Sequence, residues 1–144
     1  MRTVEASIDI AAPPERVWAV ISDLNSFSGW NPFMTQASGE LVVGAQLSIT
    51  IEPPGGKPMN FKPKILEVEP NRRLRWIGRF LIRGLFDGEH VLQVEPLNSG
   101  HTRFTQCERF SGVLTRVSGT LFSRTEAGFT AMNSALKQRC EASN

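Results

Sequence analysis

The chain predicts an α+β fold in which an antiparallel sheet of about six to seven strands curves around one long C-terminal helix. Apolar residues alternate at the N-terminus and again through the middle of the chain, and they follow a helical period near the C-terminus. Short turns separate the alternating segments, which favours antiparallel pairing. A helix with one apolar face must pack on such a sheet. At 144 residues the chain fits one domain over residues 1–144.

The N-terminal part predicts a strand followed by two short helices. Residues 2–10 alternate between apolar and polar side chains, which is typical of a half-buried strand. Pro13 and Pro14 open a helix that runs to Asp23, because proline is tolerated in a first helical turn. A second short helical segment over Leu24–Gly29 should end before Pro32, which cannot continue a helix.

Several strand segments follow, separated by turn residues. The predicted strands are Thr35–Gly39, Leu47–Ile51, Met59–Val68 and Leu74–Phe80, with turns at Pro53–Gly56 and Pro70–Asn71. A longer hairpin joins Gly84–Val94 to Thr102–Phe110 through a turn at Pro96–Gly100. Within its first strand, Asp87-Gly88 interrupts an apolar alternation, and this position favours a β-bulge over a turn.

The last element is a predicted amphipathic helix of about 25 residues that starts at Thr115. Its apolar face is marked by Val117, Leu121, Phe129, Met132 and Leu136. Trp18 and Trp30, from the N-terminal helices, are expected to anchor the core on which this helix packs.

Composition excludes several classes of protein. A net charge of +2, from 16 scattered basic and 14 acidic residues, is too small to indicate a nucleic-acid partner. Two cysteines, Cys107 and Cys140, and two histidines provide neither a disulfide framework nor metal-ligand spacing. No segment has the roughly 18 apolar residues of a membrane helix, and the N-terminus lacks a secretory signal. We therefore expect a cytoplasmic protein with reduced thiols, no metal and no cofactor.

The long hairpin carries polar residues on its apolar face. His90, Gln106 and Glu108 alternate in register with Leu92, Val94, Phe104 and Phe110. If the turn is centred near Asn98–Gly100, paired residue numbers sum to about 198, so His90 faces Glu108 and Leu92 faces Gln106. Facing residues have Cβ atoms roughly 4.5–5.5 Å apart, which lets the imidazole and the carboxylate touch.

Three interpretations of this pair are open. His90 and Glu108 can form a structural bridge at the mouth of the sheet, since buried polar groups require partners. They can recognise the polar head of an otherwise apolar ligand. They can also act as general acid and base on a bound carbonyl or enol. A register slip of one residue would turn both side chains outward and remove all three possibilities.

Four segments resemble the START-like superfamily, also called SRPBCC, in its polyketide cyclase/dehydrase-like and birch-pollen-allergen-like branch. They are Ile10–Trp18, Trp30–Phe33, Glu69–Trp76 and Glu108–Gly112. The resemblance covers essentially the whole chain and implies the helix-grip fold of that superfamily. It does not by itself assign an activity, because one fold hosts binders, carriers and enzymes.

The resemblance implies a deep apolar cavity between the sheet and the C-terminal helix. By position, the cavity-lining candidates are Phe33, Trp76, Phe86, His90, Phe104, Gln106, Glu108, Phe110, Leu121, Phe129 and Met132. The chain has no tyrosine, so a mechanism that depends on a tyrosine hydroxyl has no candidate residue.

The expected function is the cofactor-free binding of a small hydrophobic ligand, such as a lipid or a polyketide, by a monomer or homodimer. One alternative is a cyclase or dehydratase of the polyketide type, in which His90 and Glu108 are catalytic and move a proton. Another is a module that regulates a protein partner, which should show an exposed apolar patch and little cavity volume.

Overall fold

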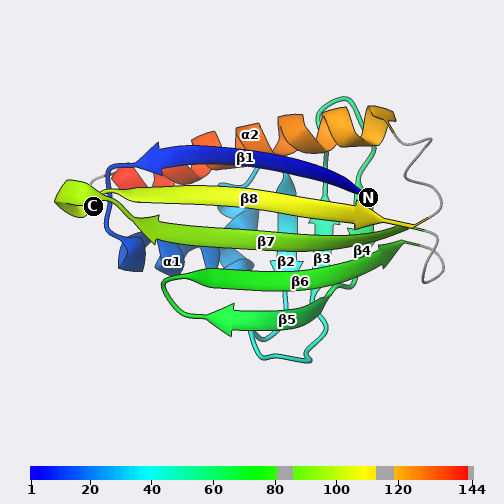
Figure 1. The fold of residues 1–144 in the computed structure, drawn as a ribbon, viewed down its shortest axis with the longest axis horizontal. Helices are drawn as coiled ribbons and strands as arrows, with labels where there is room; N and C mark the ends of the chain where they lie inside the picture. The colour runs from blue at the N-terminus through cyan, green and yellow to red at the C-terminus, as the bar shows by residue number, and fades with distance from the viewer. Residues whose placement is uncertain (81–85, 113–118, 143–144) are drawn as a thin grey trace.

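The computed structural model describes residues 1–80, 86–112 and 119–142, with the side chains of Phe80 and Phe86 outside this description. It confirms the α+β class, with a long helix lying along an antiparallel sheet (Figure 1). The elements are β1 (Arg2–Ile10), α1 (Pro14–Ile21), η1 (Leu24–Gly29), β2 (Met34–Ser38), β3 (Ser48–Ile51), β4 (Met59–Phe61), β5 (Lys64–Glu69), β6 (Arg73–Phe80), β7 (Phe86–Pro96), η2 (Asn98–Gly100), β8 (Thr102–Ser111) and α2 (Gly119–Glu141).

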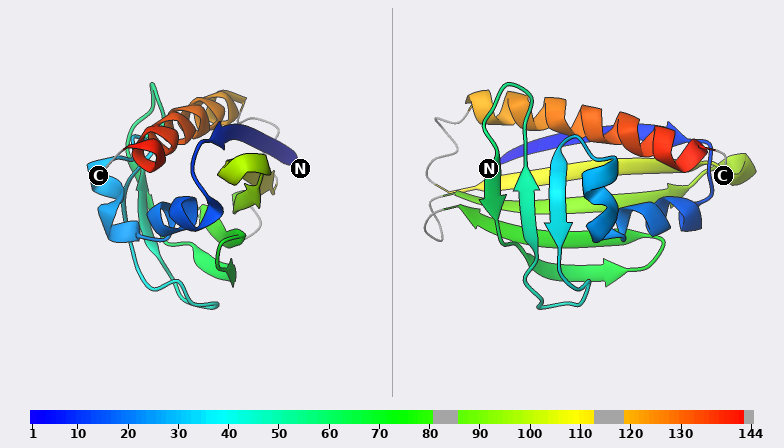
Figure 2. Two further views of the ribbon diagram at one scale, coloured as in Figure 1. Left: turned by 90° about the vertical axis from the view of Figure 1, so that its left-hand side faces the viewer. Right: turned by 180° about the vertical axis from the view of Figure 1, so that it is seen from behind.

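The described strands form two sheets. Five strands follow the order β1-β8-β7-β6-β5, and three follow the order β2-β3-β4. The three strands run across the direction of the five, so the two sheets enclose the core together with α2 (Figure 2). Inward-facing apolar side chains from both sheets and from α2 form one continuous buried cluster.

The predicted strand over Met59–Val68 is wrong as a single element. The chain leaves the three-stranded sheet after Phe61 and enters the five-stranded sheet at Lys64. Pro63 lies at the break, where its missing N–H cannot continue a ladder. Its carbonyl instead accepts a hydrogen bond from the Leu47 backbone N–H at 2.8 Å. Proline therefore directs the two halves of the segment into different sheets.

The predicted bulge at Asp87-Gly88 is also wrong. Gly88 pairs with Gly78 of β6 and with Phe110 of β8, and neither ladder shifts register there. A Cβ atom at Gly88 would overlap the carboxylate of Glu108. Glycine at this position therefore provides space for Glu108, and no extra residue is inserted.

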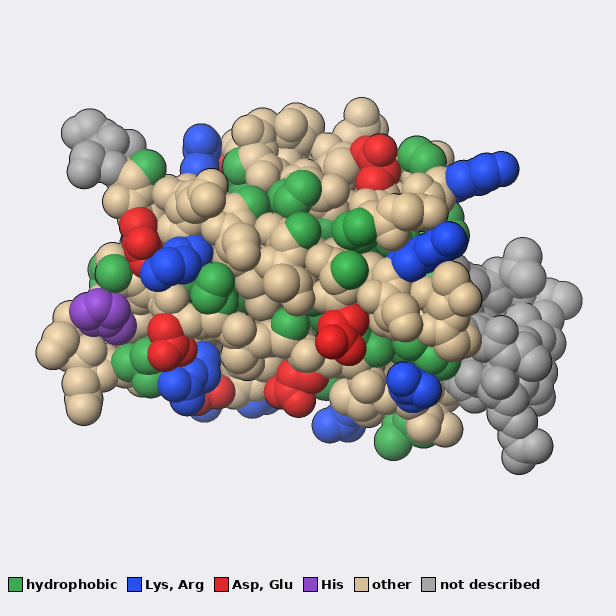
Figure 3. Space-filling view, turned by 90° about the horizontal axis from the view of Figure 1, so that it is seen from above, with side chains coloured by type: hydrophobic (Ala, Val, Ile, Leu, Met, Phe, Trp, Pro, Cys, Tyr) green, Lys and Arg blue, Asp and Glu red, His purple; other side chains and the backbone are tan. Residues whose placement is uncertain are grey.

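Helix α2 packs one face on the sheets. Its buried residues are Phe122, Thr125, Gly128, Phe129, Met132, Asn133, Leu136 and Cys140. The predicted strand start at Gly84, the predicted helix start at Thr115 and the predicted face residue Val117 lie outside the described residues. Leu121 is half-buried at the margin of the face. Charges of both signs are interspersed with small apolar patches over this side of the molecule (Figure 3).

Hydrogen bonds attach the end of α2 to the turn between β1 and α1. The Ala11 backbone N–H donates to Glu141 Oε2 at 2.7 Å. Lys137 Nζ donates to the Asp9 carbonyl at 3.1 Å and to Glu141 Oε2 at 2.6 Å. The helix is thus anchored at its C-terminal end, next to α1.

Candidate functional site

The long hairpin has the predicted register. His90 lies opposite Glu108, Leu92 opposite Gln106 and Val94 opposite Phe104. Strand alternation directs His90 and Gln106 inward, where they are 3% and 0% exposed. The prediction that His90 and Glu108 are cross-strand neighbours is confirmed.

Four polar side chains form a continuous hydrogen-bonded chain inside the sheet. His90 Nδ1 lies 3.3 Å from Glu108 Oε1, and His90 Nε2 lies 3.1 Å from Gln106 Oε1. Gln106 Nε2 then donates to Asn133 Oδ1 of α2 at 2.8 Å. The chain therefore links two strands to the helix across the core and gives each of its four side chains a partner. Asn133 Nδ2 is buried and has no partner among the described residues.

The direction of these hydrogen bonds determines which nitrogen of the His90 imidazole carries a hydrogen. Gln106 Oε1 can only accept, so His90 Nε2 must carry a hydrogen. The contact between His90 Nδ1 and Glu108 Oε1 is then a hydrogen bond only when either Nδ1 or Oε1 carries a proton. A single proton between the imidazole and the carboxylate would therefore complete the hydrogen bond. A proton shared in this way can serve a general acid or a site that recognises a ligand by hydrogen bonding.

Aromatic rings fix the imidazole in place. Trp76 of β6 stacks on His90 with ring centroids 5.1 Å apart and an interplanar angle of 26°. Phe129 of α2 approaches the same ring edge-on at 5.1 Å and 72°. His90 is therefore held on two sides, and its orientation is set before any ligand arrives.

His90 and Glu108 line a small pocket between β3, β4, β8 and α2. Its other lining residues are Phe33, Met34, Ile51, Met59, Phe61, Phe110, Leu121 and Thr125. The pocket volume is about 20 Å³, which is room for about one water molecule. The site thus consists of one histidine and one carboxylate at an otherwise mainly apolar wall.

A larger surface pocket adjoins this interior. It measures about 450 Å³ and lies between the turn after β3 and the first turns of α2. Met59 and Leu121 line both pockets, so these two side chains separate the outer space from the inner one. Lys57 and Arg124 contribute positive charge to the outer pocket.

The predicted cavity residues fall into two groups around His90. Phe33, Phe110 and Leu121 line the small pocket with His90 and Glu108. The others are packed in the core and do not line this pocket: Trp76, Phe104, Gln106, Phe129 and Met132. The side chain of Phe86 lies outside the described residues. For all of these residues, contact with a ligand stays a prediction.

Sequence reasoning did not select Asn133, Thr125, Met59 or Phe61. Asn133 and Thr125 are polar residues on the buried face of α2, only 2% and 3% exposed. Their spacing of four residues from Phe129 was a usable signal, because it places them on the same helical face. Met59 and Phe61 could not be assigned, since their segment was expected to belong to one continuous strand.

The remaining chemistry of the described residues is limited. No three histidine, cysteine, aspartate or glutamate side chains in these ranges come together as a metal ion would require. Burial raises the pKa of the Cys107 thiol, and it raises the pKa of Cys140 to about 11. None of the helices within the described ranges has the length and apolar character needed to cross a membrane.

Antiparallel strands that curve around one long C-terminal helix define the helix-grip class of protein, and this chain has that architecture. Residues 1–141 match the family described as "Polyketide cyclase / dehydrase and lipid transport". The chain belongs to this family. Among curated proteins, none matches the chain.

Solved structures share the fold over nearly the whole chain. A START superfamily protein from Mycobacterium smegmatis has a TM-score of 0.76 at 16% identity, covering 96% of this chain and 97% of its own. The ZhuI aromatase/cyclase from a Streptomyces species has a TM-score of 0.79 at 15% identity, with coverages of 97% and 93%. A protein from Thermobifida fusca has a TM-score of 0.75 at 20% identity, with the same coverages. At these identities the similarity concerns the fold.

Proposed function

We propose that this protein binds a small, largely apolar molecule between its sheets and α2, with the polar group of the ligand at His90 and Glu108. The observation that carries the proposal is a buried, oriented histidine paired with a partly buried carboxylate on the wall of a mainly apolar pocket. A few convergent polar groups in apolar surroundings are typical of small-molecule sites. The family description, which includes lipid transport, supports the same class of ligand.

Ligand uptake requires the interior to widen. Small-molecule pockets usually measure roughly 300–1,000 Å³, whereas the inner pocket measures about 20 Å³. We expect the side chains of Met59 and Leu121 to move, because they separate the inner pocket from the outer pocket of about 450 Å³. Both are only partly buried, so their displacement disrupts little of the core.

The test compares two aromatic probes that differ by one hydroxyl group, 2-naphthol and naphthalene. The wild-type protein should prefer 2-naphthol, and both His90→Ala and Glu108→Gln should weaken 2-naphthol binding by about tenfold, the effect of one lost charge-assisted hydrogen bond. Naphthalene binding should change little. Affinities are measured by competition with the neutral fluorophore Nile red.

Matched controls separate recognition from general damage. His101 is an exposed histidine whose side chain is hydrogen-bonded to the backbone carbonyl of Ser99, and Glu40 is exposed. His101→Ala and Glu40→Gln should leave both affinities unchanged. Equal binding of the two probes by the wild type, unaltered in the His90 and Glu108 variants, would reject recognition by the pair. Failure of the wild type to bind either probe would reject the interior as a ligand site.

A second candidate, a cyclase or dehydratase activity, is favoured by the bonding of His90. Its Nε2 is held by Gln106, which leaves Nδ1 and Glu108 to exchange a proton beside the pocket. One of the similar structures is an aromatase/cyclase. If the pair moves protons, the protein should exchange the α-hydrogens of a bound aryl ketone with deuterium from the solvent. His90→Ala should abolish this exchange, and an unchanged rate would exclude the role.

The interaction-module alternative meets its expectation of little cavity volume, because the inner pocket measures about 20 Å³. Its other expectation, an exposed apolar patch, has a narrower basis. Val42 and Val43 are exposed apolar residues, at 56% and 63%, in the loop between β2 and β3. Two neighbouring valines form a small patch, and scattered exposed apolar residues are normal. We therefore rank this alternative below ligand binding. Native mass spectrometry of protein purified from its own host distinguishes the two, because a retained small molecule adds mass that a protein partner does not match.

A further inference from the structure

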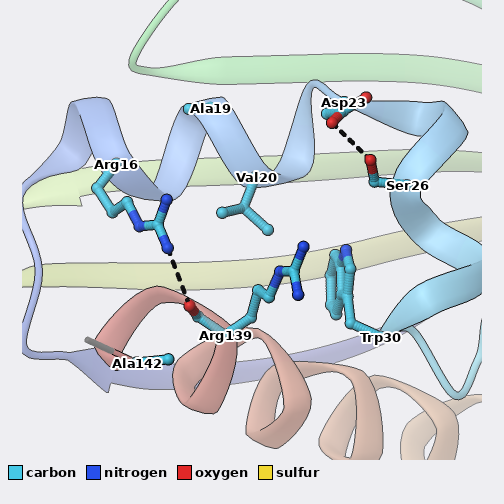
Figure 4. Close-up of a pocket in the computed structure, with 8 residues that line it drawn as sticks. All are labelled: Arg16, Ala19, Val20, Asp23, Ser26, Trp30, Arg139 and Ala142. Carbon is cyan, nitrogen blue, oxygen red and sulfur yellow. Dashed lines mark hydrogen bonds between the residues drawn. The ribbon is translucent and has the colours of Figure 1, made fainter. Parts of the chain in front are cut away.

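A separate pocket of about 320 Å³ lies between α1, η1 and the last turn of α2 (Figure 4). It shares no lining residue with the pocket at His90. Its volume is at the lower end of the range for small-molecule sites, roughly 300–1,000 Å³. The charged and hydrogen-bonding side chains that line it are Arg16, Asp23, Ser26, Trp30 and Arg139.

Two arginines bring positive charge to this pocket. Arg16 Nη2 donates to the backbone carbonyl of Arg139 at 3.2 Å, which holds α1 against the end of α2. Within the described ranges neither guanidinium lies within 4.0 Å of a carboxylate, whereas Arg75 and Arg103 both do. The guanidinium of Arg139 extends into the space between the two helices (Figure 4). Unpaired guanidinium donors fit the oxygens of phosphate and carboxylate groups.

Trp30 adds a neutral donor. Its indole Nε1 is closed to solvent and has no hydrogen-bond acceptor among the residues that the structure describes. The ring is held by an edge contact to Phe27, with centroids 5.4 Å apart, and lies beside the Arg139 side chain (Figure 4). Buried indole N–H groups usually have a partner. Because Nε1 is closed to solvent, an oxygen acceptor bound in this pocket reaches it when the neighbouring Arg139 side chain moves aside.

Asp23 sets a limit on the charge of the ligand. Its Oδ2 accepts a hydrogen bond from Ser26 Oγ at 2.6 Å, on the η1 side of the pocket. The lining therefore carries two positive charges and one negative charge. We propose that this pocket binds a small organic molecule with one oxyanion group, a phosphate monoester or a carboxylate, which lies against Arg16, Arg139 and Trp30.

The test uses the indole N–H signals of the three tryptophans in ¹⁵N-labelled protein. Phenyl phosphate, benzoate and inorganic phosphate are titrated separately at constant ionic strength. The Trp30 signal should move on binding, while the Trp18 and Trp76 signals stay in place. Arg139→Gln should weaken binding by about tenfold. It should fold normally, because the Arg139 side chain makes no hydrogen bond or ion pair within the described ranges.

Two further variants make the result decisive. Arg16→Gln removes the second positive charge and should also weaken binding. Arg109→Gln makes the same charge change at an exposed position of β8 and should leave binding unchanged. A response to phenyl phosphate alone identifies a phosphate monoester site, and a response to benzoate as well identifies a general oxyanion site. The proposal is overturned if no probe moves the Trp30 signal, or if Arg109→Gln weakens binding as much as Arg139→Gln.

Discussion

At the scale of single residues, the buried polar chain sets the character of the interior. Gln106 is its central member, because it accepts from His90 and donates to Asn133 while fully buried. A buried amide with both partners made contributes to stability, and removing it leaves two other groups unpaired. The same amide fixes which nitrogen of His90 carries a hydrogen, so its role in structure and its role in chemistry are inseparable.

Gln106→Leu should therefore destabilise the protein by about 1–3 kcal/mol, since a buried donor and a buried acceptor both lose their partners. Urea unfolding measures the change. Gln93→Leu is the matched control, because Gln93 lies on the neighbouring strand β7 and its amide donates only to an exposed contact with Glu95. The two variants should differ clearly in midpoint. An equally small effect in both would show that the network does not stabilise the fold.

Cys140 predicts a loss of stability at alkaline pH. Burial raises its thiol pKa from 9.0 to about 11 in the folded protein. Between these two values the unfolded chain releases the thiol proton while the folded chain keeps it. The stabilising contribution is therefore complete below about pH 9 and lost as the pH rises to about 11. Each pKa unit corresponds to about 1.4 kcal/mol, so the loss over this interval is on the order of a few kcal/mol.

Cys140→Ala removes this titrating group. The difference in unfolding free energy between about pH 8 and about pH 10 should be smaller in the variant than in the wild type. Urea unfolding at the two pH values provides the measurement. An identical pH dependence in both proteins would contradict the assigned cause.

At the scale of elements, the packing of α2 depends on a close contact between the helix backbone at Gly128 and the ring of Phe33. Gly128 lies on the buried face of the helix, and a Cβ atom there would overlap the ring of Phe33. Phe33 in turn lines the pocket at His90 and contacts Phe129 edge-on at 5.7 Å. A glycine in mid-helix costs about 1 kcal/mol relative to alanine. Here it permits the contact between the helix and the segment before β2.

Gly128→Ala should lower the melting temperature, because overpacking against Phe33 costs about 1–3 kcal/mol and exceeds the gain in helix propensity. Gly29→Ala is the control, since a Cβ atom at Gly29 would meet nothing within 4 Å. Thermal unfolding by circular dichroism compares the two. An unchanged or raised melting temperature for Gly128→Ala would show that the Phe33 ring yields without cost.

At the scale of the whole molecule, the two pockets lie at different ends of α2. The last turns of α2 are tied to the turn before α1 by Lys137 and Glu141, and the oxyanion pocket lies beside this attachment. The pocket at His90 lies near the first turns of the helix, where Leu121 and Thr125 form part of its wall. The anchored end can therefore hold a preformed site, while the other end has to adjust to admit a ligand.

The sequence by itself determined the α+β class, the element order, the hairpin register and the pairing of His90 with Glu108. These depend on periodicity and on turn length, which are local properties of the chain. Only the tertiary structure decided the division at Pro63, the contact of Gly88 with Glu108, the link from Gln106 to Asn133 and the meeting of Arg16 with Arg139. The last two join residues 27 and 123 positions apart, and no local pattern records such contacts. Both contacts form because α2 packs on the sheets and on α1, and this packing depends on side chains from distant parts of the chain.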